Sequence, residues 1–346
     1  MKKLQTWLTI IVVIGLFLSA CNPQTPITSS TAAPDITQPP IASDTPRPTA
    51  TSTPPPTDTQ EPTSTPILPT ETATSVPTLA VTEPITGSTR VSEIDQIEQV
   101  YVPAGAFIMG SDSDLAKKTI EGGRAYPEIP VHTVTLDGYW IDKYEVSNAQ
   151  YALCVEAGAC ELPFVLGSET RPHYYDDPQY GNYPVMWVNW YMAGTYCQWA
   201  GRRLPTEAEW EKAARGPNGQ EYPWGNEPIT GERANFCDIN CERTIANGKY
   251  DDGYADTAPV DSYPAGVSPY GAMNMAGNLW EWVSSIIMPY PYDPDDGRED
   301  QEVYSERVWR GGPWSNGTWW MRSSLRYRSV PTYWWVNLGF RCAASR

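Results

Sequence analysis

The chain has 346 residues and a formal net charge of −17. This acidic balance argues against nucleic acid as a partner, because its phosphates would be repelled. The 15 Trp and 21 Tyr against only 5 Phe are unusual, and because both side chains combine apolar area with a polar tip, they suit half-buried positions and binding surfaces.

The first 20 residues have the pattern of a signal peptide. Lys2 and Lys3 precede an apolar core, residues 7–17, that is too short to span a bilayer comfortably. The following string, Leu18-Ser-Ala-Cys21, resembles a bacterial lipoprotein signal, which implies cleavage before Cys21 and lipid attachment to its sulfur. We expect an extracytoplasmic protein, lipid-anchored to the outer face of the bacterial cell membrane. The alternative is an ordinary signal peptide with an incidental cysteine.

Residues 21–95 are expected to form a disordered tether. Pro, Thr and Ser dominate this stretch, so it cannot bury enough apolar area to offset the entropy lost on ordering. Proline biases it toward polyproline II, so roughly seventy residues at about 3.1 Å each would reach on the order of 100–200 Å. The tether would hold a folded domain, residues 96–346, away from the membrane.

Alternating and capped segments follow in the domain. Residues 101–111 and 131–141 read as strands and turns. The stretch after Gly216 is rich in Gly, Pro, Asn and Asp, and predicts little regular structure. Capping residues and stop glycines predict three helices: from the box Ser147–Gln150 to Gly158, from Asn189 to Gly201, and from the box Thr206–Glu209 to Gly216.

Six cysteines remain if Cys21 carries lipid, enough for three disulfides in an oxidising compartment. Cys154 and Cys160 flank the end of the first predicted helix, close enough for a local bridge. Cys237 and Cys241 lie four apart in a loop and can also bridge locally. A four-cysteine zinc site is the rival interpretation, but the spacings are poor for it.

Several strings, in order along the domain, resemble the formylglycine-generating enzyme (sulfatase-modifying factor) family. The resemblance implies an α+β fold related to C-type lectins, with sparse secondary structure, a small twisted antiparallel sheet, a few helices and long calcium-ordered loops. It also implies a disulfide between Cys197 and Cys342. The strings are Val188-Asn-Trp-Tyr-Met-Ala-Gly-Thr-Tyr-Cys197, Gly201-Arg-Arg-Leu-Pro-Thr-Glu-Ala-Glu-Trp-Glu211, Tyr222-Pro-Trp-Gly-Asn226, Asn274-Met-Ala-Gly-Asn-Leu-Trp-Glu-Trp282 and Asn337-Leu-Gly-Phe-Arg-Cys342.

The resemblance further implies two structural Ca²⁺ sites. In each, one carboxylate and one amide oxygen would join backbone carbonyls, the hard oxygen ligands that Ca²⁺ prefers. Read alone, Asp252 and Glu281 would more often be loop caps or surface charges. The first site would use Asn235, Phe236, Asp252 and Tyr254, and the second would use Asn274, Gly277, Leu279 and Glu281.

The family's oxidases convert a sulfatase cysteine to formylglycine with a reactive cysteine pair that binds copper and oxygen. The corresponding stretch here, residues 313–322, has no cysteine, and none occurs between Cys241 and Cys342. Copper is therefore not an expected cofactor, because soft sulfur ligands hold cuprous copper. Met321 supplies only one thioether and is expected to pack in the core.

An aromatic, arginine-containing groove remains as the candidate binding site. Aromatic faces and arginines together hold sugar rings or peptides, although some of these residues are expected to be core. The predicted groove consists of Trp314, Asn316, Trp319, Trp320, Arg322, Arg326, Tyr327, Tyr333, Trp334 and Trp335.

The sequence thus predicts a lipid-anchored module that binds a glycan or polypeptide without oxidising it. The alternative is a formylglycine-generating oxidase that acts on sulfatases or another protein substrate without the cysteine pair. A purely structural envelope protein is a third reading.

Overall fold

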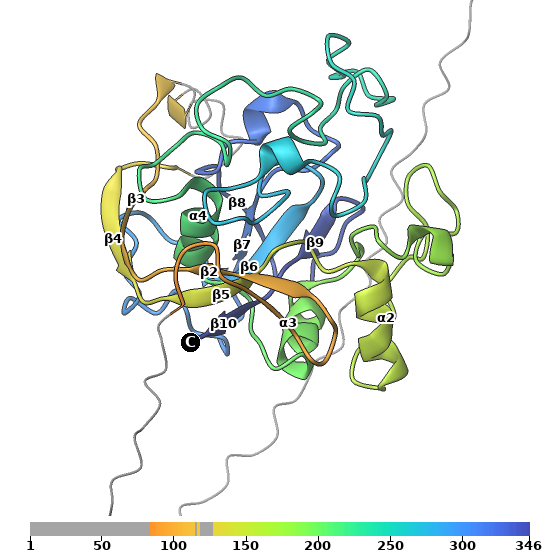
Figure 1. Cartoon of the computed structure of the whole chain (residues 1–346), viewed down its shortest axis with the longest axis horizontal. Coiled ribbons are helices and arrows are strands. Elements are labelled where there is room, and N and C mark those ends of the chain that lie inside the picture. The colour runs from red at the N-terminus through yellow and green to blue at the C-terminus, as the bar shows by residue number, and fades with distance from the viewer. Residues whose placement is uncertain (1–83, 115, 118–126) are drawn as a thin grey trace, which may run out of the picture. The chain divides into compact units, whose positions relative to one another are not determined.

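Small sheets and short helices, joined by long loops, form the domain in the computed structural model, which describes residues 84–114, 116–117 and 127–346 (Figure 1). The predicted signal peptide, lipidated Cys21 and most of the predicted tether lie outside these residues. One sheet has the order β1 (Thr89–Val91), β2 (Glu98–Val102), β5 (Tyr139–Asp142) and β10 (Ala343–Ser345); another pairs β3 (Gly105–Met109) with β4 (His132–Leu136); a third has the order β8 (Tyr327–Ser329), β7 (Arg307–Arg310), β6 (Trp280–Ile286) and β9 (Leu338–Phe340).

The folded part begins before residue 96, where the sequence had placed the boundary. β1 pairs antiparallel with β2 in the register Thr89↔Val100. Asp95 is buried, accepts a hydrogen bond from the Tyr196 hydroxyl at 2.6 Å and forms an ion pair with Arg202. Strand pairing and the buried ion pair order residues 89–95, which the predicted boundary assigns to the tether.

The three predicted helices are confirmed with their caps. Local side-chain-to-backbone hydrogen bonds satisfy the first free amides of each helix, which is why the cap sequences identified them. Within the described residues, no helix has the length and apolar character needed to cross a bilayer. The helices are α2 (Asn148–Glu156) with the Ser147–Gln150 capping box, α3 (Trp190–Trp199) capped by Asn189, and α4 (Glu207–Arg215) with the Thr206–Glu209 capping box and Gly216 at φ +69°.

The third sheet was missed because its central strand lacks alternation. β6 is buried along its whole length, so both of its faces are covered and no polar side appears in the sequence. β6 pairs antiparallel with β7 and parallel with β9. The segment after Gly216 is therefore more regular than predicted.

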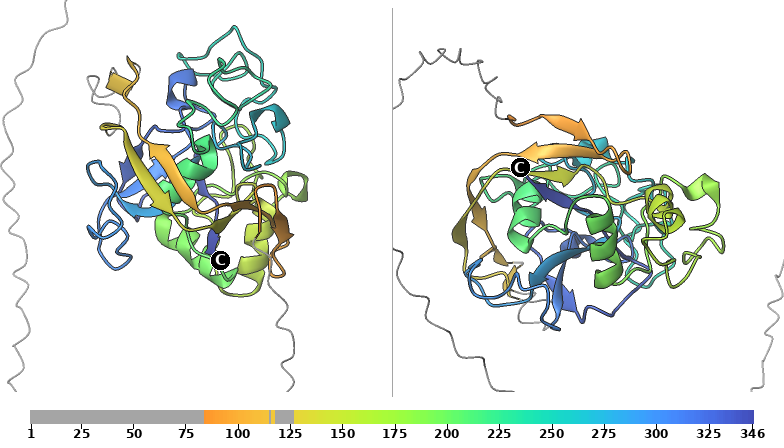
Figure 2. Two further views of the ribbon diagram at one scale, coloured as in Figure 1. Left: turned by 60° about the vertical axis from the view of Figure 1, so that its left-hand side comes forward. Right: turned by 90° about the horizontal axis from the view of Figure 1, so that it is seen from below.

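Helices α3 and α4 lie between the first and third sheets (Figure 2). Trp210 and Ala213 of α4 pack in one buried cluster with Ile141 of β5 and Val283 of β6. Residues of α3 pack against β6 and β9 in a second buried cluster. The helices thus join the amino-terminal strands to the carboxyl-terminal sheet, and they position the loops that carry the candidate site.

All three disulfide predictions are confirmed, as Cys154–Cys160, Cys197–Cys342 and Cys237–Cys241. The Cys197–Cys342 bond links α3 to the end of the chain across a sequence separation of 145 residues. The other two close short loops, with separations of 6 and 4 residues.

Candidate functional site

A continuous chain of aromatic rings crosses the surface from the 3₁₀ turn η3 (Thr318–Trp320) to the loop after α2. We call it the aromatic surface. Neighbouring ring centroids along it lie 4.1–6.3 Å apart, which is the range of stacked and edge-to-face contacts. In order, its rings are Trp319, Trp320, Tyr327, Trp309, Tyr333, Trp335, Trp187, Trp334 and Phe164.

The aromatic surface has a buried base and an exposed rim. Trp309 of β7 is 5% exposed and supports Tyr327 and Tyr333 at 5.4 Å each. Trp335 and Phe164 are 47% and 49% exposed. Because soluble monomers rarely leave large rings together in water, these exposed rings make the aromatic surface the candidate contact for a ligand.

Two hydrogen bonds hold Trp187, one ring of the aromatic surface, in a strained backbone conformation. Trp187 has a φ of +61°, a left-handed conformation that is an outlier for a bulky residue and often accompanies function. Its amide donates to the Trp335 carbonyl at 3.3 Å, and its indole N–H donates to the Gly167 carbonyl at 2.7 Å. The first bond fixes the segment before α3 against the segment before β9, and the second fixes it against the loop after α2.

Three predicted groove residues are buried and do not line this surface. Arg322 forms a bidentate pair with Glu128 at 2.7 and 2.8 Å, and Arg326 forms one with Glu207 at 2.6 and 2.7 Å. Both arginines are 0% exposed, and Trp314 is 2% exposed. The prediction that these three contact a ligand is wrong, because the two guanidinium groups neutralise buried carboxylates and Trp314 packs in a buried apolar cluster.

The stretch corresponding to the oxidases' cysteines is occupied by structural contacts. Asn316 is half-buried, and its carbonyl accepts the Cys237 amide at 3.0 Å. The Ser315 hydroxyl accepts a hydrogen bond from the Asn337 side chain at 2.7 Å. Met321 is fully buried in an apolar cluster, as expected for a packing residue.

Three residues of the first predicted calcium site, Phe236, Asp252 and Tyr254, meet at the Asp252 carboxylate. Its carboxylate accepts the backbone N–H groups of Phe236 at 2.9 Å and Tyr254 at 3.0 Å. Burial raises the pKa of Asp252 to about 7, with Asp238 and Asp251 nearby adding to the effect. The side-chain oxygen of Asn235 is buried without a hydrogen-bond partner. The Asn235 side-chain amide donates to the Asp256 carbonyl at 2.8 Å. The unsatisfied Asn235 oxygen and the Asp252 carboxylate are both oxygen ligands of the kind that Ca²⁺ prefers.

The carboxylate of the second predicted calcium site, Glu281, lies in a buried ion pair. Both Glu281 oxygens bind Arg341, at 2.7 Å each, and one also accepts the Trp210 indole N–H at 2.8 Å. Glu281 is therefore already paired with Arg341 in the structure, and its role as a cation ligand stays a prediction. Gly277 and Leu279 are buried beside it, and the Gly277 amide donates to the Gly311 carbonyl at 3.1 Å.

A carboxylate that the sequence reasoning missed lies next to this site. Glu145 is 0% exposed and accepts the side-chain amides of Asn274 at 2.8 Å and Asn278 at 3.0 Å. Burial raises the pKa of Glu145 to about 8, helped by the Glu281 charge. One oxygen of Glu145 and the side-chain oxygen of Asn274 are buried without partners. In sequence, Glu145 stands 129 residues from Asn274, and no local signal marked it.

Within the described residues, no cluster of three or more His, Cys, Asp or Glu side chains is placed to hold a metal ion. Any cation here would therefore depend on amide and backbone oxygens together with single carboxylates, the ligand type that suits Ca²⁺ and not zinc or copper.

Comparison with known proteins places these features in a family context. Residues 87–346 match the model of the sulfatase-modifying factor enzyme 1-like domain. The chain is 36% identical over 287 residues to the formylglycine-generating enzyme of Streptomyces coelicolor, covering 71% of this chain and 88% of that protein. It is 31% identical over 287 residues to the mouse protein named inactive C-alpha-formylglycine-generating enzyme 2, covering 71% and 85%. The solved structure of PvdO from Pseudomonas aeruginosa superposes with a TM-score of 0.59 at 27% identity, over 76% of this chain and all of that one.

Proposed function

Since the chain belongs to the family of sulfatase-modifying factor enzyme 1-like domains, we propose that it is a member that binds its ligand without oxidising it. One observation carries the proposal. All six cysteines of the domain are in disulfides, and residues 313–322 contain none. The thiolate pair by which the family's oxidases bind copper is therefore missing. A mouse relative that is named inactive is 31% identical to this chain.

The proposed ligand contact is the aromatic surface, and the ligand is an extended glycan or polypeptide. Large rings supply most of the binding energy at such contacts through stacking and burial. Arg322 and Arg326 are already paired with carboxylates, so binding would depend on stacking more than on charge. We therefore expect only a weak dependence of affinity on salt.

We further propose that the protein is lipid-anchored at the outer face of the cell membrane. The proposal rests on the pattern of residues 1–21 and on the three disulfides, which persist in oxidising compartments. Under this proposal, the mature protein starts at a lipidated Cys21, and the domain acts at the end of its tether.

Replacing Trp335 with alanine is expected to weaken ligand binding at least about tenfold, as truncation of a central aromatic anchor does. Trp335 is 47% exposed, so its loss should leave the melting temperature nearly unchanged. Binding is measured by affinity electrophoresis in soluble polysaccharides and by fluorescence titration with unfolded polypeptides, which separates the two ligand classes. The control is Tyr304→Ala, an aromatic residue 61% exposed outside the aromatic surface.

One assay distinguishes the proposed binding function from the alternative oxidase function. The purified protein is incubated with copper, oxygen and a Cys-x-Pro-x-Arg peptide. We expect no aldehyde above background, because the chain lacks the thiol pair. Aldehyde formation would establish the alternative. Equal binding by Trp335→Ala and the native chain would instead remove the aromatic surface as the site.

We also propose structural Ca²⁺ in the loops, at Asn235 and Asp252 and at Asn274 with Glu145 in place of Glu281. The support is the set of buried oxygens without hydrogen-bond partners on Asn235, Asn274 and Glu145. When bound, the cation would order loops that have few regular hydrogen bonds of their own.

Removing calcium is expected to destabilise the domain. A site that is saturated about 100-fold above its Kd contributes about 2.7 kcal/mol, which corresponds to a drop of roughly 5–10 °C in melting temperature for a domain of this size. Scanning calorimetry with and without chelator measures this, and Ca²⁺ but not Mg²⁺ should restore the transition. Asp252→Asn should remove the part of the response due to the first site. A transition unchanged by chelator would contradict both sites.

A further inference from the structure

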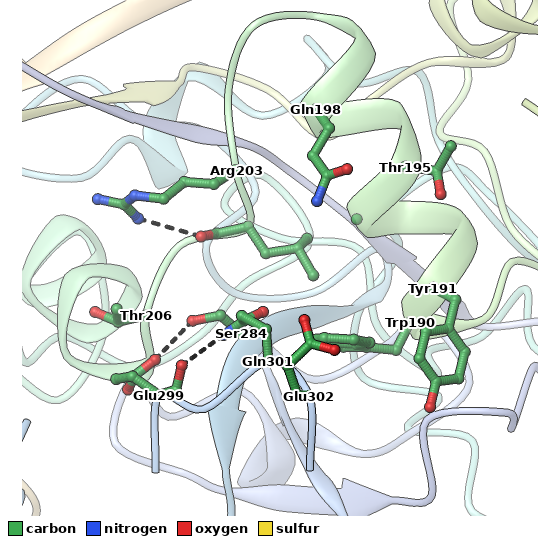
Figure 3. A pocket seen from close by; sticks show the side chains of 12 residues that line it. Trp190, Tyr191, Thr195, Gln198, Arg203, Thr206, Ser284, Glu299, Gln301 and Glu302 are labelled. Carbon is green, nitrogen blue, oxygen red and sulfur yellow. Dashed lines mark hydrogen bonds between the residues drawn. The ribbon is translucent and has the colours of Figure 1, made fainter. Parts of the chain in front are cut away.

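A cavity of about 670 Å³, separate from the aromatic surface, lies between α3, the start of α4 and the loop that carries Glu299 to Glu302. Figure 3 shows its lining side chains. None of the predicted groove residues lines it, and neither proposed calcium site includes any of its residues. Its walls differ in character: one comes from a helix face, one is apolar and one is acidic.

One wall is a single face of α3 that lacks a side chain in its middle. Tyr191, Gly194, Thr195 and Gln198 line the cavity at the helical spacing of one face. Glycine is a poor residue for a helix interior, so Gly194 needs a reason to be there. Packing does not supply one, because a Cβ at Gly194 would meet no heavy atom within 4 Å. A longer side chain at this position would extend into the cavity.

The apolar wall is formed by fixed side chains. The indole N–H of Trp190 donates to the Val283 carbonyl at 2.9 Å. Tyr191 stands edge-on to Trp190, with centroids 5.3 Å apart and an interplanar angle of 81°, and is 44% exposed. Together with Leu204 they offer a preformed surface for a chain of methylene groups.

The acidic wall carries Glu299 and Glu302. The Glu299 carboxylate is held in place by the hydroxyls of Ser284 at 2.8 Å and Tyr292 at 2.9 Å. Of the neighbouring cations, Arg203 is bound at 2.6 Å by both of its amino groups to Glu209. Arg307 lies 4.2 Å from the Trp190 ring centroid, donates to the Ser284 carbonyl at 2.8 Å and offsets part of the Glu299 charge, which leaves Glu302 as the more available carboxylate. Figure 3 shows Glu299 beside Ser284, and Glu299 and Glu302 both line the cavity, so it carries two carboxylates next to the apolar wall.

We propose that this cavity binds an alkyl chain ending in an ammonium or guanidinium group, such as a lysine or arginine side chain of a polypeptide or a small organic amine. The stem lies along Trp190, Tyr191 and Leu204, and the cationic end meets Glu299 or Glu302. The side-chain oxygens of Gln198 and Gln301 accept remaining N–H groups. The net charge of −17 draws such cations toward the protein.

In the test, each of four probes is titrated into the full-length protein, and binding is measured by calorimetry and NMR. These are the N-acetyl methylamides of lysine, arginine and norleucine, and 1,5-diaminopentane. We expect the cationic probes to bind at least about tenfold more tightly than the norleucine derivative, which has the stem but no charge. Lysine and arginine derivatives that bind while the diamine does not would identify a polypeptide ligand, and the reverse would identify a small amine.

Two variants locate the binding. Gly194→Leu, at a position where a Cβ would meet no heavy atom within 4 Å, places an alkyl group in the cavity, and Glu302→Gln removes an exposed charge. Each is expected to weaken binding at least about tenfold. Matched controls are Gly248→Leu, at another glycine whose Cβ would meet nothing within 4 Å, and Glu242→Gln on an exposed loop. Equal binding of norleucine, no titration by any probe, or unchanged affinity in Gly194→Leu would each overturn the proposal. None of these outcomes bears on the aromatic surface, which is tested through Trp335.

Discussion

Replacing Arg326 with methionine is expected to cost about 3–5 kcal/mol of folding free energy, because it leaves the Glu207 carboxylate buried without its partner. Both side chains of the pair are 0% exposed, and the guanidinium also donates to the Met288 carbonyl at 3.0 Å. Methionine keeps the apolar stem but supplies no positive charge. Urea unfolding followed by circular dichroism measures the loss.

Arg328 provides the matched control two residues away. It pairs with Glu306 at 2.6 Å, but the side chains are 40% and 45% exposed, so Arg328→Met should cost only about 0–1 kcal/mol. Equal losses in the two variants would show that burial does not set the cost. If Arg326→Met kept full stability and lost ligand binding instead, Arg326 would belong to the ligand site, and the original groove prediction would be right for this residue.

Removing the Cys197–Cys342 bond, as Cys197→Ala with Cys342→Ala, is expected to be the second large effect. The bond closes a loop with a sequence separation of 145 residues, and the chain-entropy model gives about 5 kcal/mol for a loop of that length. Measured losses for native bridges in secreted domains are about 2–5 kcal/mol, so we expect a result near the top of that range. Urea unfolding without reductant gives the value.

The Cys237–Cys241 bond is the internal comparison, because its sequence separation is only 4 residues. The same model gives about 2 kcal/mol for so short a loop, and Cys237→Ser with Cys241→Ser should therefore destabilise the domain less. Equal losses would indicate that native-state packing, and not loop closure, sets the contribution. Free thiols at Cys197 and Cys342 in mass spectrometry would show that the pairing is wrong in the isolated protein.

Features that depend on neighbouring residues were predictable from the sequence. The capping boxes at Ser147 and Thr206 were recognisable because donor and acceptor lie three residues apart. The short spacing between cysteines was enough to predict two of the disulfides. The Cys197–Cys342 bond and the fold class were implied by the strings that resemble the family. The sequence predicts a domain start at residue 96, which is too late. β1 is only three residues long, and its partner β2 lies beyond the Pro-, Thr- and Ser-rich stretch from which the tether was predicted.

Features that depend on distant partners were decided only by the tertiary structure. Arg322 and Arg326 were expected beside a ligand, but their carboxylate partners stand 194 and 119 residues earlier in the chain. Glu145 was overlooked as a buried charge for the same reason, and the cavity beside Gly194 joins three segments that have no common motif.

The sequence by itself therefore determined the helices, the cysteine framework, the absence of a thiol pair in residues 313–322 and the family of the domain. Which aromatic rings face solvent, which arginines are neutralised and which carboxylates lack a partner were decided by the tertiary structure. The physical reason is that the energy of a charge or a ring depends on what surrounds it in space. In a fold made mostly of loops, those surroundings come from distant parts of the chain.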